Sequence, residues 1–321
     1  MVQAATLRPL GHSGLMVPKL TFGGNVLGWT ADRAMSFRLL DACLDAGLNA
    51  IDTADAYSFW APGGKGGESE TIIGEWLKAR GNRDRVLIFT KVGHKFGDMP
   101  GGLAAQTIER GVEASLKRLG IDCIDLYMAH YDDPATPQDE TMGAFATLVK
   151  AGKVRVLGAS NFTAERLASA QKASVELRLP RFESLQTHYN LMERPAFEGA
   201  LEDFCTASHL GVMSYFSLAR GFLSGKYRTA ADGGQSPRGG SVLDYLGGAK
   251  GQAVLKALDR VAAELDSNPA QISLAWLMAR PSVTTAIASA TKPEQLVDLI
   301  KSTQLVLPAW AIEQLNAASA E

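Results

Sequence analysis

Residues 49–60 read NAIDTADAYSFW, an apolar run of strand length that is interrupted at its end by two aspartates and a tyrosine. Apolar, β-rich runs of this length recur along the chain, separated by amphipathic stretches. The eight predicted strands are Leu20–Gly23, Asn49–Asp52, Val86–Lys91, Ile124–His130, Val154–Ser160, Glu183–Thr187, Gly211–Tyr215 and Val283–Ala288. Near-continuous apolar strands of this kind indicate a parallel sheet that is covered by helices.

The stretches between the strands have helical periodicity. In Ala31–Ala46 the apolar residues fall three or four positions apart, and Gly47 follows as a stop signal. Thr163 and the pair Asn268-Pro269 are typical start signals. The other predicted helices are Glu68–Arg80, Thr107–Leu119, Glu140–Ala151, Ala164–Ala173, Ala196–Ala207 and Pro269–Ala279.

Eight strand–helix repeats predict a closed (β/α)8 TIM barrel, and an open Rossmann-type sheet is the competing topology. No predicted strand is followed by G-x-G-x-x-G, and GGNVLG at residues 23–28 has a different glycine spacing. The missing fingerprint disfavours the Rossmann topology. We therefore predict a single α/β barrel domain over residues 1–321.

Two segments lie outside this repeat. Residues 7–18, LRPLGHSGLMVP, read as a short hairpin around His12-Ser13-Gly14 that plugs the bottom of the barrel. The connection between Tyr215 and Pro269 is far too long for an ordinary βα loop, and it contains ADGGQSPRGGS and LGGAKG. We expect a long, partly mobile loop there that acts as a lid or substrate loop.

The composition excludes several classes of partner. With 32 basic and 34 acidic residues among 321, the net charge is −2, so no global field favours nucleic acid or an anionic membrane. The three scattered cysteines form no C-x-x-C pair, which indicates free thiols in a reducing compartment. No signal sequence or apolar run of membrane-spanning length is present, so we expect a cytoplasmic location. Nothing in the sequence distinguishes a monomer from an oligomer.

Polar side chains end several of the predicted strands. Asp52, Lys91 and His130 end the second, third and fourth strands, and Tyr57 follows Asp52 in the same loop. The next three strands end in Ser160-Asn161, pass through Gln186 and end in Tyr215. Because the carboxyl ends of barrel strands carry the active site, we expect these side chains to converge on one face. A lysine there is buried, so it needs a charged partner.

An acid, a base, an imidazole and a phenol together can protonate an oxygen that is gaining negative charge. The ammonium of Lys91 would lower the pKa of Tyr57, and Asp52 would keep Lys91 charged and oriented. Tyr57 could then donate the proton, and His130 could hold the same oxygen. Carbonyl reduction needs this proton and no nucleophile or metal, and its hydride must come from a cofactor.

These residues also carry a family resemblance. The motifs DTADAY, Lys91 in FTKVG, DLYMAH and GASNF, in this order, resemble the aldo-keto reductase superfamily. The similarity runs from LGHSGLMVPKLTFGG to ATKPEQL, which is most of the chain. It implies a catalytic tetrad of Asp52, Tyr57, Lys91 and His130 that reduces an aldehyde or ketone. It also implies an extended NADP(H) across the barrel mouth, with NAD(H) less favoured.

The same resemblance assigns cofactor contacts to the strand ends. It implies that Ser160, Asn161 and Gln186 bind the nicotinamide carboxamide and that Tyr215 stacks on the ring, with His188 beside this shelf. The residues implied at the nicotinamide border are Gly23, Gly24 and Asn25; those covering the pyrophosphate are Leu218, Arg220, Gly221 and Lys226; those near the 2′-phosphate or adenine are Ser289, Thr291, Lys292, Gln295 and Asp298.

Several positions depart from the family pattern or lie beyond it. Phe216-Ser217 stand where Ser-Pro is usual, and Ser289 and Leu299 replace a glycine and an asparagine, which weakens the preference for NADPH over NADH. Phe59 and Trp60 lie in a lengthened loop after Tyr57 and are candidates for an apolar wall of the substrate pocket. We expect Asp55 to cap or solvate this loop. Asp132 and Asp133 are either polar groups of the pocket or solvated residues, and we expect them to be solvated.

Two other classes of function are open. Some members of the superfamily act as nucleotide-sensing partners of channels, so a non-catalytic regulatory subunit is the alternative to a reductase. A metal-dependent barrel hydrolase or aldolase could use Asp52 and His130, but the other histidines form no H-x-H or H-x-x-x-H pair. We therefore expect no metal. The expected partner is a small carbonyl compound whose identity is not encoded in any transferable motif.

Overall fold

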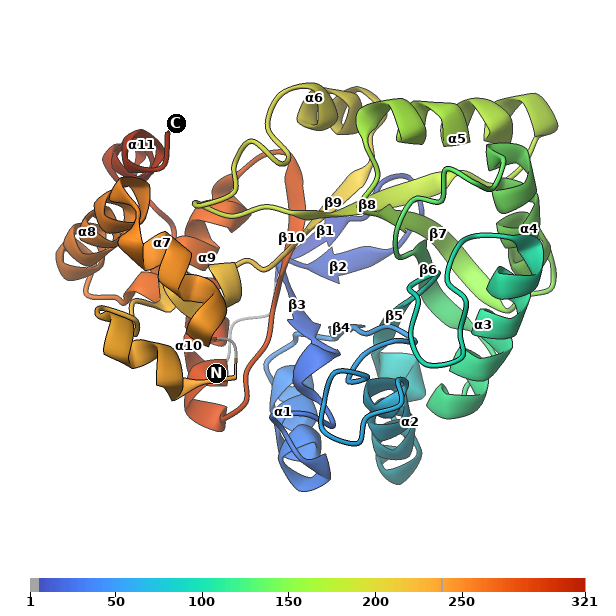
Figure 1. Cartoon of the computed structure of the whole chain (residues 1–321), viewed down its shortest axis with the longest axis horizontal. Coiled ribbons are helices and arrows are strands. Elements are labelled where there is room, and N and C mark those ends of the chain that lie inside the picture. The colour runs from blue at the N-terminus through green and yellow to red at the C-terminus, as the bar shows by residue number, and fades with distance from the viewer. Residues whose placement is uncertain (1–5, 238, 321) are drawn as a thin grey trace.

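The computed structural model describes residues 6–237 and 239–320, and its central feature is a closed barrel of eight parallel strands (Figure 1). The strands are β3 (Leu20–Gly23), β4 (Ala50–Asp52), β5 (Leu87–Val92), β6 (Ile124–Ala129), β7 (Val154–Ser160), β8 (Phe182–His188), β9 (Gly211–Tyr215) and β10 (Val283–Ala288). Each lies within one residue of its predicted bounds. The predicted (β/α)8 barrel is confirmed.

The strand register closes the barrel and aligns its rim. Ala286 of β10 pairs with Leu20 of β3 on one side and with Ser214 of β9 on the other. Asp52 of β4 lies opposite Gly23 of β3 and Phe89 of β5. Because all eight strands are parallel, their carboxyl ends share one rim, and the polar residues that end them lie on it.

Helices connect the strands and cover the outside of the barrel (Figure 1). They are α1 (Arg33–Asp45), α2 (Glu68–Arg80), α3 (Ala105–Leu119), α4 (Gln138–Lys150), α5 (Ala164–Leu177), α6 (Ala200–Ala207), α9 (Pro269–Ala279) and α10 (Pro293–Ser302). The Thr163 and Asn268 side chains accept hydrogen bonds from the first turns of α5 and α9, as predicted. The prediction for α6 began four residues too early, because Gly199 at φ 94° interrupts the backbone before Ala200.

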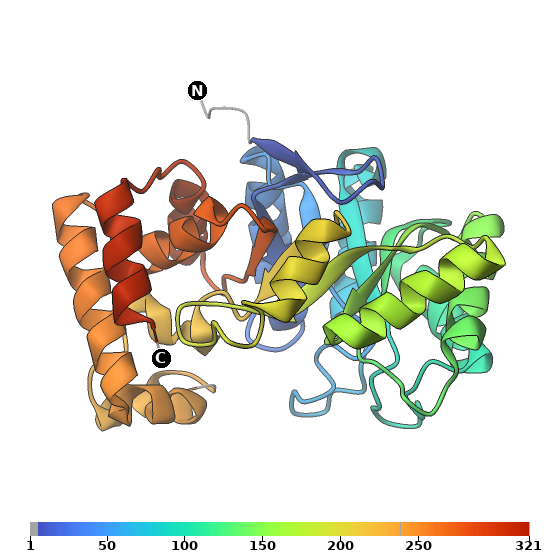
Figure 2. The same cartoon turned by 90° about the horizontal axis from the view of Figure 1, so that it is seen from above.

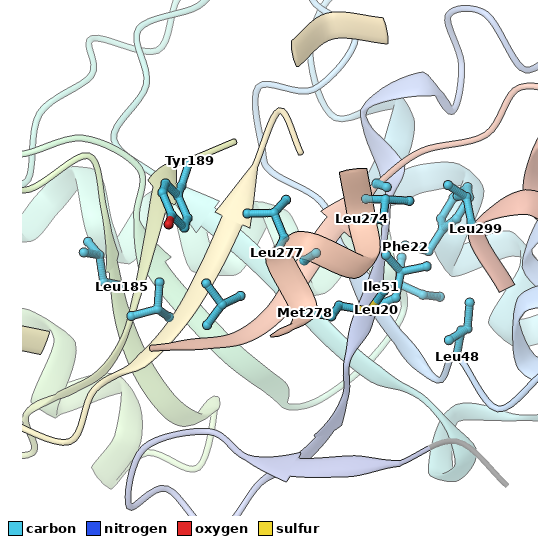
Figure 3. Packing of buried hydrophobic residues seen from close by; sticks show 14 of the residues in the cluster. Leu20, Phe22, Leu48, Ile51, Leu185, Tyr189, Leu274, Leu277, Met278 and Leu299 are labelled. Atoms are coloured by element: carbon cyan, nitrogen blue, oxygen red, sulfur yellow. The ribbon is translucent and has the colours of Figure 1, made fainter. Parts of the chain in front are cut away.

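The main core lies between the barrel and its helices. Figure 3 shows Leu274, Leu277 and Met278 of α9 beside the barrel residues Leu20 and Phe22. All five side chains are buried in one continuous hydrophobic cluster. This cluster fixes the outer face of each strand, so that the alternate residues point into the barrel.

The N-terminal hairpin is present as predicted. β1 (Leu7–Pro9) pairs with the antiparallel strand β2 (Met16–Pro18) (Figure 2). Three buried hairpin residues join a second cluster with interior barrel residues such as Phe89 and Met213; they are Leu10, Leu15 and Val17. The hairpin therefore seals the amino end of the barrel with apolar side chains.

The long connection after β9 is mostly helical, which the sequence prediction of a loop missed. It contains α7 (Leu243–Gly247) and the sixteen-residue helix α8 (Ala249–Glu264), as well as short 3-10 turns. α8 packs beside the C-terminal helix α11 (Ala309–Ala318) (Figure 2). The glycines before α8 suggested a loop, but the apolar face of this helix, including Val254 and Leu258, is buried. In the described parts of the chain, no helix has the length and apolarity needed to cross a membrane.

Candidate active site

Lys91 is the centre of a hydrogen-bonded cluster at the carboxyl rim. Its Nζ lies 2.9 Å from Asp52 Oδ2, 2.9 Å from Tyr57 Oη and 2.7 Å from the Thr53 carbonyl oxygen. The side chains of Lys91 and Asp52 are 0% and 2% exposed, so the buried lysine has the partner that the sequence required. Three acceptors around three N–H groups hold the ammonium in one orientation.

Asp52 is held from two sides. Its Oδ2 bonds to Lys91 and accepts a 3.3 Å hydrogen bond from Tyr57 Oη, while its Oδ1 accepts a 2.7 Å bond from Gln186 Nε2 of β8. Gln186, which the resemblance assigned to the nicotinamide, therefore also orients the carboxylate. Asp52 is at the end of β4, and Tyr57 reaches back to it from the following loop.

His130 follows β6 and faces the same cluster. Its ring centroid lies 6.1 Å from that of Tyr57, and its backbone N–H donates to the Val92 carbonyl at 2.8 Å. The buried Nδ1 has no hydrogen-bond partner among the described residues. Burial, reinforced by the charge of Lys91, lowers the pKa of His130 well below its usual value of 6.5. The imidazole is therefore neutral at physiological pH.

The ionisation of Tyr57 differs from the sequence prediction. Burial, followed by the negative charge of Asp52, raises the pKa of Tyr57 well above 10, whereas we predicted that Lys91 would lower it. The pKa of Lys91 is lowered by burial, and Asp52 opposes that effect. The prediction considered the ammonium alone and left out the cost of burying a phenolate. Tyr57 is thus a neutral O–H donor rather than an activated phenolate.

The next part of the rim is a hydrogen-bonded chain from β7 to β9. Tyr215 Oη donates to Asn161 Oδ1 at 2.7 Å, and Asn161 Nδ2 donates to the His130 carbonyl at 2.9 Å and to Ser160 Oγ at 3.1 Å. Asn161 adopts a left-handed backbone conformation, φ 59°. His188 stacks on Tyr215 with a centroid distance of 5.3 Å and an interplanar angle of 14°. This arrangement fixes the Tyr215 ring at the mouth.

The segment after β9 combines strained backbone with unpaired cations. Phe216, Ala219 and Arg220 have φ values of 50°, 46° and 58°, which non-glycine residues seldom adopt. The guanidinium of Arg220 lies 5.1 Å from the Phe216 ring, and Lys226 Nζ lies 4.8 Å from the Tyr227 ring. Neither cation forms a salt bridge with a carboxylate of the described residues. Leu218 packs against the core, and Gly221 at φ 102° completes the turn.

The ends of β3 and β10 contact each other at the rim. Ser289 Oγ donates to Asn25 Oδ1 at 2.6 Å. A Cβ at Gly23 would lie 2.5 Å from Ser289 Oγ, and one at Gly24 would lie 2.9 Å from the Asp52 carbonyl oxygen. The Asp52 carbonyl oxygen is a fixed backbone atom, so Gly24 leaves no room for a side chain, and its backbone passes directly beside Asp52.

The residues assigned to the adenine end lie around the start of α10. Lys292 is exposed at the N-cap, and Gln295 Oε1 accepts hydrogen bonds from the backbone N–H and the hydroxyl of Thr291. Asp298 accepts from the side chains of Asn268 and Gln271, at 2.9 and 2.8 Å. Asp298 therefore joins α10 to the start of α9, a role that the sequence did not suggest.

Comparison with known proteins identifies the family. Residues 19–320 match the Aldo/keto reductase family. The chain belongs to this family. It is 34% identical over 314 residues to the protein named uncharacterized oxidoreductase YrpG of Bacillus subtilis (strain 168), with 96% of this chain and 94% of that protein covered. It is 33% identical to aldo-keto reductase AFTS1 of Alternaria alternata, with 86% and 82% covered.

A further relative is named as a channel subunit rather than as an oxidoreductase. The putative voltage-gated potassium channel subunit beta of Schizosaccharomyces pombe is 31% identical over 321 residues, with 93% of this chain and 88% of that protein covered. The family resemblance seen in the sequence motifs is confirmed, and the chain is an NAD(P)H-dependent oxidoreductase. In the parts of this aldo/keto reductase that the structure describes, no group of three side chains could hold a metal ion.

The mouth of this aldo/keto reductase contains more aromatic residues than the sequence suggested. Phe59 and Trp60 were expected there, and their ring centroids lie 5.3 Å apart. Trp29, His94 and Tyr131 join them, although none of these three was named among the residues predicted for the substrate pocket. Each follows a barrel strand by a few residues, and this position is the signal that could have found them.

Three aspartates near the site differ from their predicted roles. Asp55 is 1% exposed rather than solvated, and neither carboxylate oxygen has a hydrogen-bond partner among the described residues. Asp132 forms a 2.7 Å ion pair with Arg166. Asp133 accepts hydrogen bonds from Leu103 N at 2.8 Å and from the Thr136 hydroxyl at 2.6 Å. The last two aspartates fix loops, and Asp55 is a buried, unpaired acid.

Proposed function

We propose that this chain reduces an aldehyde or ketone to the alcohol with NADPH, and that Tyr57 is the general acid. The observation that carries the proposal is the 2.9 Å contact between Tyr57 Oη and the buried Lys91 ammonium, which Asp52 holds in place. A neutral phenol beside a fixed cation is suited to donate a proton to an oxygen that gains charge.

Each member of the cluster has a distinct part in this proposal. Tyr57 gives its hydroxyl proton to the carbonyl oxygen as the new alcohol forms, and Lys91 stabilises the phenolate that remains. Asp52 keeps Lys91 charged, and Gln186 keeps Asp52 oriented. His130 is neutral, so its ring can hold the substrate oxygen without competing as an acid.

The rim residues fit a nicotinamide cofactor. Arg220 and Lys226 are cations without a carboxylate partner among the described residues, which suits them to the pyrophosphate, and the Gly24 backbone lies close to Asp52. When bound, NAD(P)H supplies the hydride, so that together with the Tyr57 proton the carbonyl becomes an alcohol and NAD(P)⁺ is left. Ser160, Asn161 and Tyr215 would hold the nicotinamide.

Lys292 supports a preference for NADPH. It is exposed at the N-terminus of α10, where a helix favours anions, and a 2′-phosphate would gain from both effects. Thr291 and Gln295 lie on the same turn and would border the adenosine. We also propose that residues 1–321 act as one domain, which the family match over residues 19–320 supports.

The test of the mechanism is Tyr57→Phe. This substitution removes the proton and leaves the ring in place, so kcat should fall by about 10³-fold or more while the affinity for NADPH, measured by fluorescence titration, changes less than threefold. Turnover is followed as loss of reduced-nicotinamide absorbance over a panel of carbonyl compounds. Retention of more than a tenth of the wild-type kcat in the variant would refute the assignment of Tyr57.

A second candidate function is a nucleotide-sensing regulatory subunit, since one relative is named as a potassium channel subunit beta. The hydrogen-bonded cluster around Lys91 favours catalysis instead. A single-turnover experiment separates the two candidates. Bound NADPH should be oxidised within seconds after an aldehyde is added to a reductase, whereas a sensor would keep it reduced for minutes.

A further inference from the structure

One side of the barrel mouth is bordered by five rings from four different loops. Trp29 follows β3, Phe59 and Trp60 follow β4, His94 follows β5, and Tyr131 follows β6. We call these five residues the aromatic mouth. They come from adjacent strands of the barrel, which places them on the same side of the rim as Tyr57.

Two sets of ring contacts connect the aromatic mouth to Tyr57. The Trp60 ring lies 5.8 Å from the Tyr57 ring. Tyr131 stacks on His130, with centroids 5.0 Å apart and an interplanar angle of 16°, and His130 in turn lies 6.1 Å from Tyr57. A substrate whose carbonyl oxygen is near the Tyr57 hydroxyl must therefore have its remaining atoms beside these rings.

The rings are held in fixed orientations. Trp29 makes an edge contact with Trp60 at 5.8 Å, and Phe59 makes another at 5.3 Å. His94 lies within 5.4 Å of both Phe59 and Tyr131. Its Nδ1 is 2.7 Å from the Lys95 carbonyl oxygen, which can only accept, so Nδ1 carries the proton.

The backbone beside these rings is fixed as well. Ser58 adopts a φ of 74°, and its hydroxyl donates to the Leu27 carbonyl at 2.8 Å. Ser58 is fully buried and immediately precedes Phe59 and Trp60. A residue in this conformation persists only where its surroundings hold it, so the turn that presents Trp60 is rigid. The part of the aromatic mouth that carries Phe59 and Trp60 is therefore preorganised.

Two of these rings are partly open to solvent. Trp60 is 40% exposed and Tyr131 is 45% exposed, while Lys91, which lies against the Tyr57 ring, is completely buried. Exposed apolar rings next to a buried reactive group are typical of a ligand site. An aromatic ring packed against either of them gains stacking energy of about 0.5–1.5 kcal/mol for each pair beyond simple burial. A saturated or polar group in the same place lacks the π-system that this stacking requires.

We propose that the aromatic mouth selects planar aromatic aldehydes and ketones over saturated carbonyl compounds and sugars. Trp60 and Tyr131 are the specificity-determining residues, and Trp29, Phe59 and His94 hold them. This inference rests on the proposed carbonyl reduction and names its substrate class. The reaction is unchanged: the aromatic carbonyl gains a hydride from the cofactor and a proton from Tyr57, and it leaves as the benzylic alcohol.

The test compares benzaldehyde with cyclohexanecarboxaldehyde, which has the same carbon skeleton without the planar π-system, and with glyceraldehyde as a polar substrate. The full chain with NADPH should show a kcat/KM for benzaldehyde at least tenfold above that for either of the others. In Trp60→Leu and in Tyr131→Leu the preference for benzaldehyde over cyclohexanecarboxaldehyde should fall at least fivefold, mainly through the KM for benzaldehyde.

Trp310→Leu is the matched control. Trp310 is 42% exposed on α11, far from the mouth, so the variant loses an equally exposed tryptophan and should keep the wild-type preference. Circular dichroism and thermal unfolding confirm that each variant is folded. Equal kcat/KM values for benzaldehyde and cyclohexanecarboxaldehyde, or an unchanged preference in both mouth variants, would overturn this inference and leave carbonyl reduction standing. The absence of turnover with every carbonyl would overturn both.

Discussion

The two ends of the barrel each bury a carboxylate beside a cation, but they complete the pair differently. At the carboxyl end, Asp52 bonds to Lys91, and the ammonium bonds onward to Tyr57. At the amino end, Asp125 of β6 is held by Arg83 at 2.8 Å and by Arg155 at 2.6 Å, and it also accepts from the Ile88 backbone N–H at 2.9 Å. The side chains of both aspartates are 2% exposed.

The difference lies in what the cations do next. Arg83 donates its other N–H groups to the carbonyl oxygens of Val86 and Cys123, so its hydrogen bonds only join parts of the scaffold. Lys91 instead directs one N–H at a hydroxyl that can release a proton. The buried ion pair therefore bonds only to the scaffold at the amino end, whereas at the carboxyl end it also bonds to the hydroxyl that we propose as the proton donor.

Lys91→Met is expected to have the largest effect. The methionine fills the space of the lysine but leaves Tyr57 without an adjacent cation, so kcat/KM for carbonyl reduction should fall by about 10³-fold or more. The variant should also lose stability, because Asp52 becomes a buried charge held only by neutral groups. Steady-state kinetics and urea unfolding measure the two effects.

A double variant separates charge from fold at the same site. Asp52→Asn combined with Lys91→Met replaces the pair by neutral side chains of similar size, so its free energy of unfolding should lie within about 1 kcal/mol of wild type or above it. The double variant should be as inactive as the single one. Activity within tenfold of wild type in either protein would contradict the comparison between the two ends.

Asp125→Asn tests the other end and should have the opposite outcome. Asparagine keeps an acceptor for Ile88 but loses the charge that holds two arginines, which should cost about 2–3 kcal/mol of unfolding free energy. The estimate is moderate because the side chains of Arg83 and Arg155 are 29% and 54% exposed. Urea unfolding measures the loss, and kcat/KM of the folded protein should stay within twofold of wild type.

Glu113→Gln is a suitable control for that experiment. Glu113 pairs with Lys153 on the surface, with both side chains well exposed, so losing this pair should change the unfolding free energy by less than about 1 kcal/mol. If Asp125→Asn were no more destabilising than Glu113→Gln, the amino-end cluster would not be a structural counterpart of the site.

The sequence predicted the barrel well because its signals are local. Apolar runs, caps and stop residues located all eight strands, and the polar residues that end them located Asp52, Lys91 and His130. The helix α8 was missed because its burial depends on α11, which packs on it from the C-terminal end of the chain. The Asp125 cluster was missed because its three charges are spread between residues 83 and 155 and meet only after folding.

The pKa values of the site residues also could not be predicted from the sequence. The raised pKa of Tyr57 results first from burial, which residue spacing does not report. Asp55 shows the same limit. It is only three residues from Asp52, but its side chain lies in the shell near Glu70 of α2 and Arg118 of α3 instead of inside the barrel. Glu70 already bonds to Thr90 at 2.6 Å and to Arg118 at 2.7 Å, so Asp55 is left without a partner among the described residues.

Asp55→Asn should therefore stabilise the protein in a pH-dependent way, with the smallest effect of the series. Burial, then the charge of Glu70, raises the pKa of Asp55 well above 3.8, while Arg118, the backbone N–H of Ala56 and Lys91 only partly oppose them. Between pH 3.8 and this raised pKa the folded state keeps a proton that the unfolded state has lost, so the contribution of Asp55 to stability falls by up to about 1.4 kcal/mol for each pH unit.

The asparagine is neutral at every pH and avoids this loss, so the advantage of Asp55→Asn over wild type should grow as the pH rises from 4.5 to 7.5, by no more than about 1.4 kcal/mol for each pH unit. Urea unfolding at three pH values measures the difference, and exposed Asp98→Asn corrects for the loss of one carboxylate from the chain. An advantage that stays constant with pH would mean that Asp55 is ionised in the folded protein. Asp55 would then be a charged acid stabilised by nearby cations, like Asp52 and Asp125 at the two ends of the barrel.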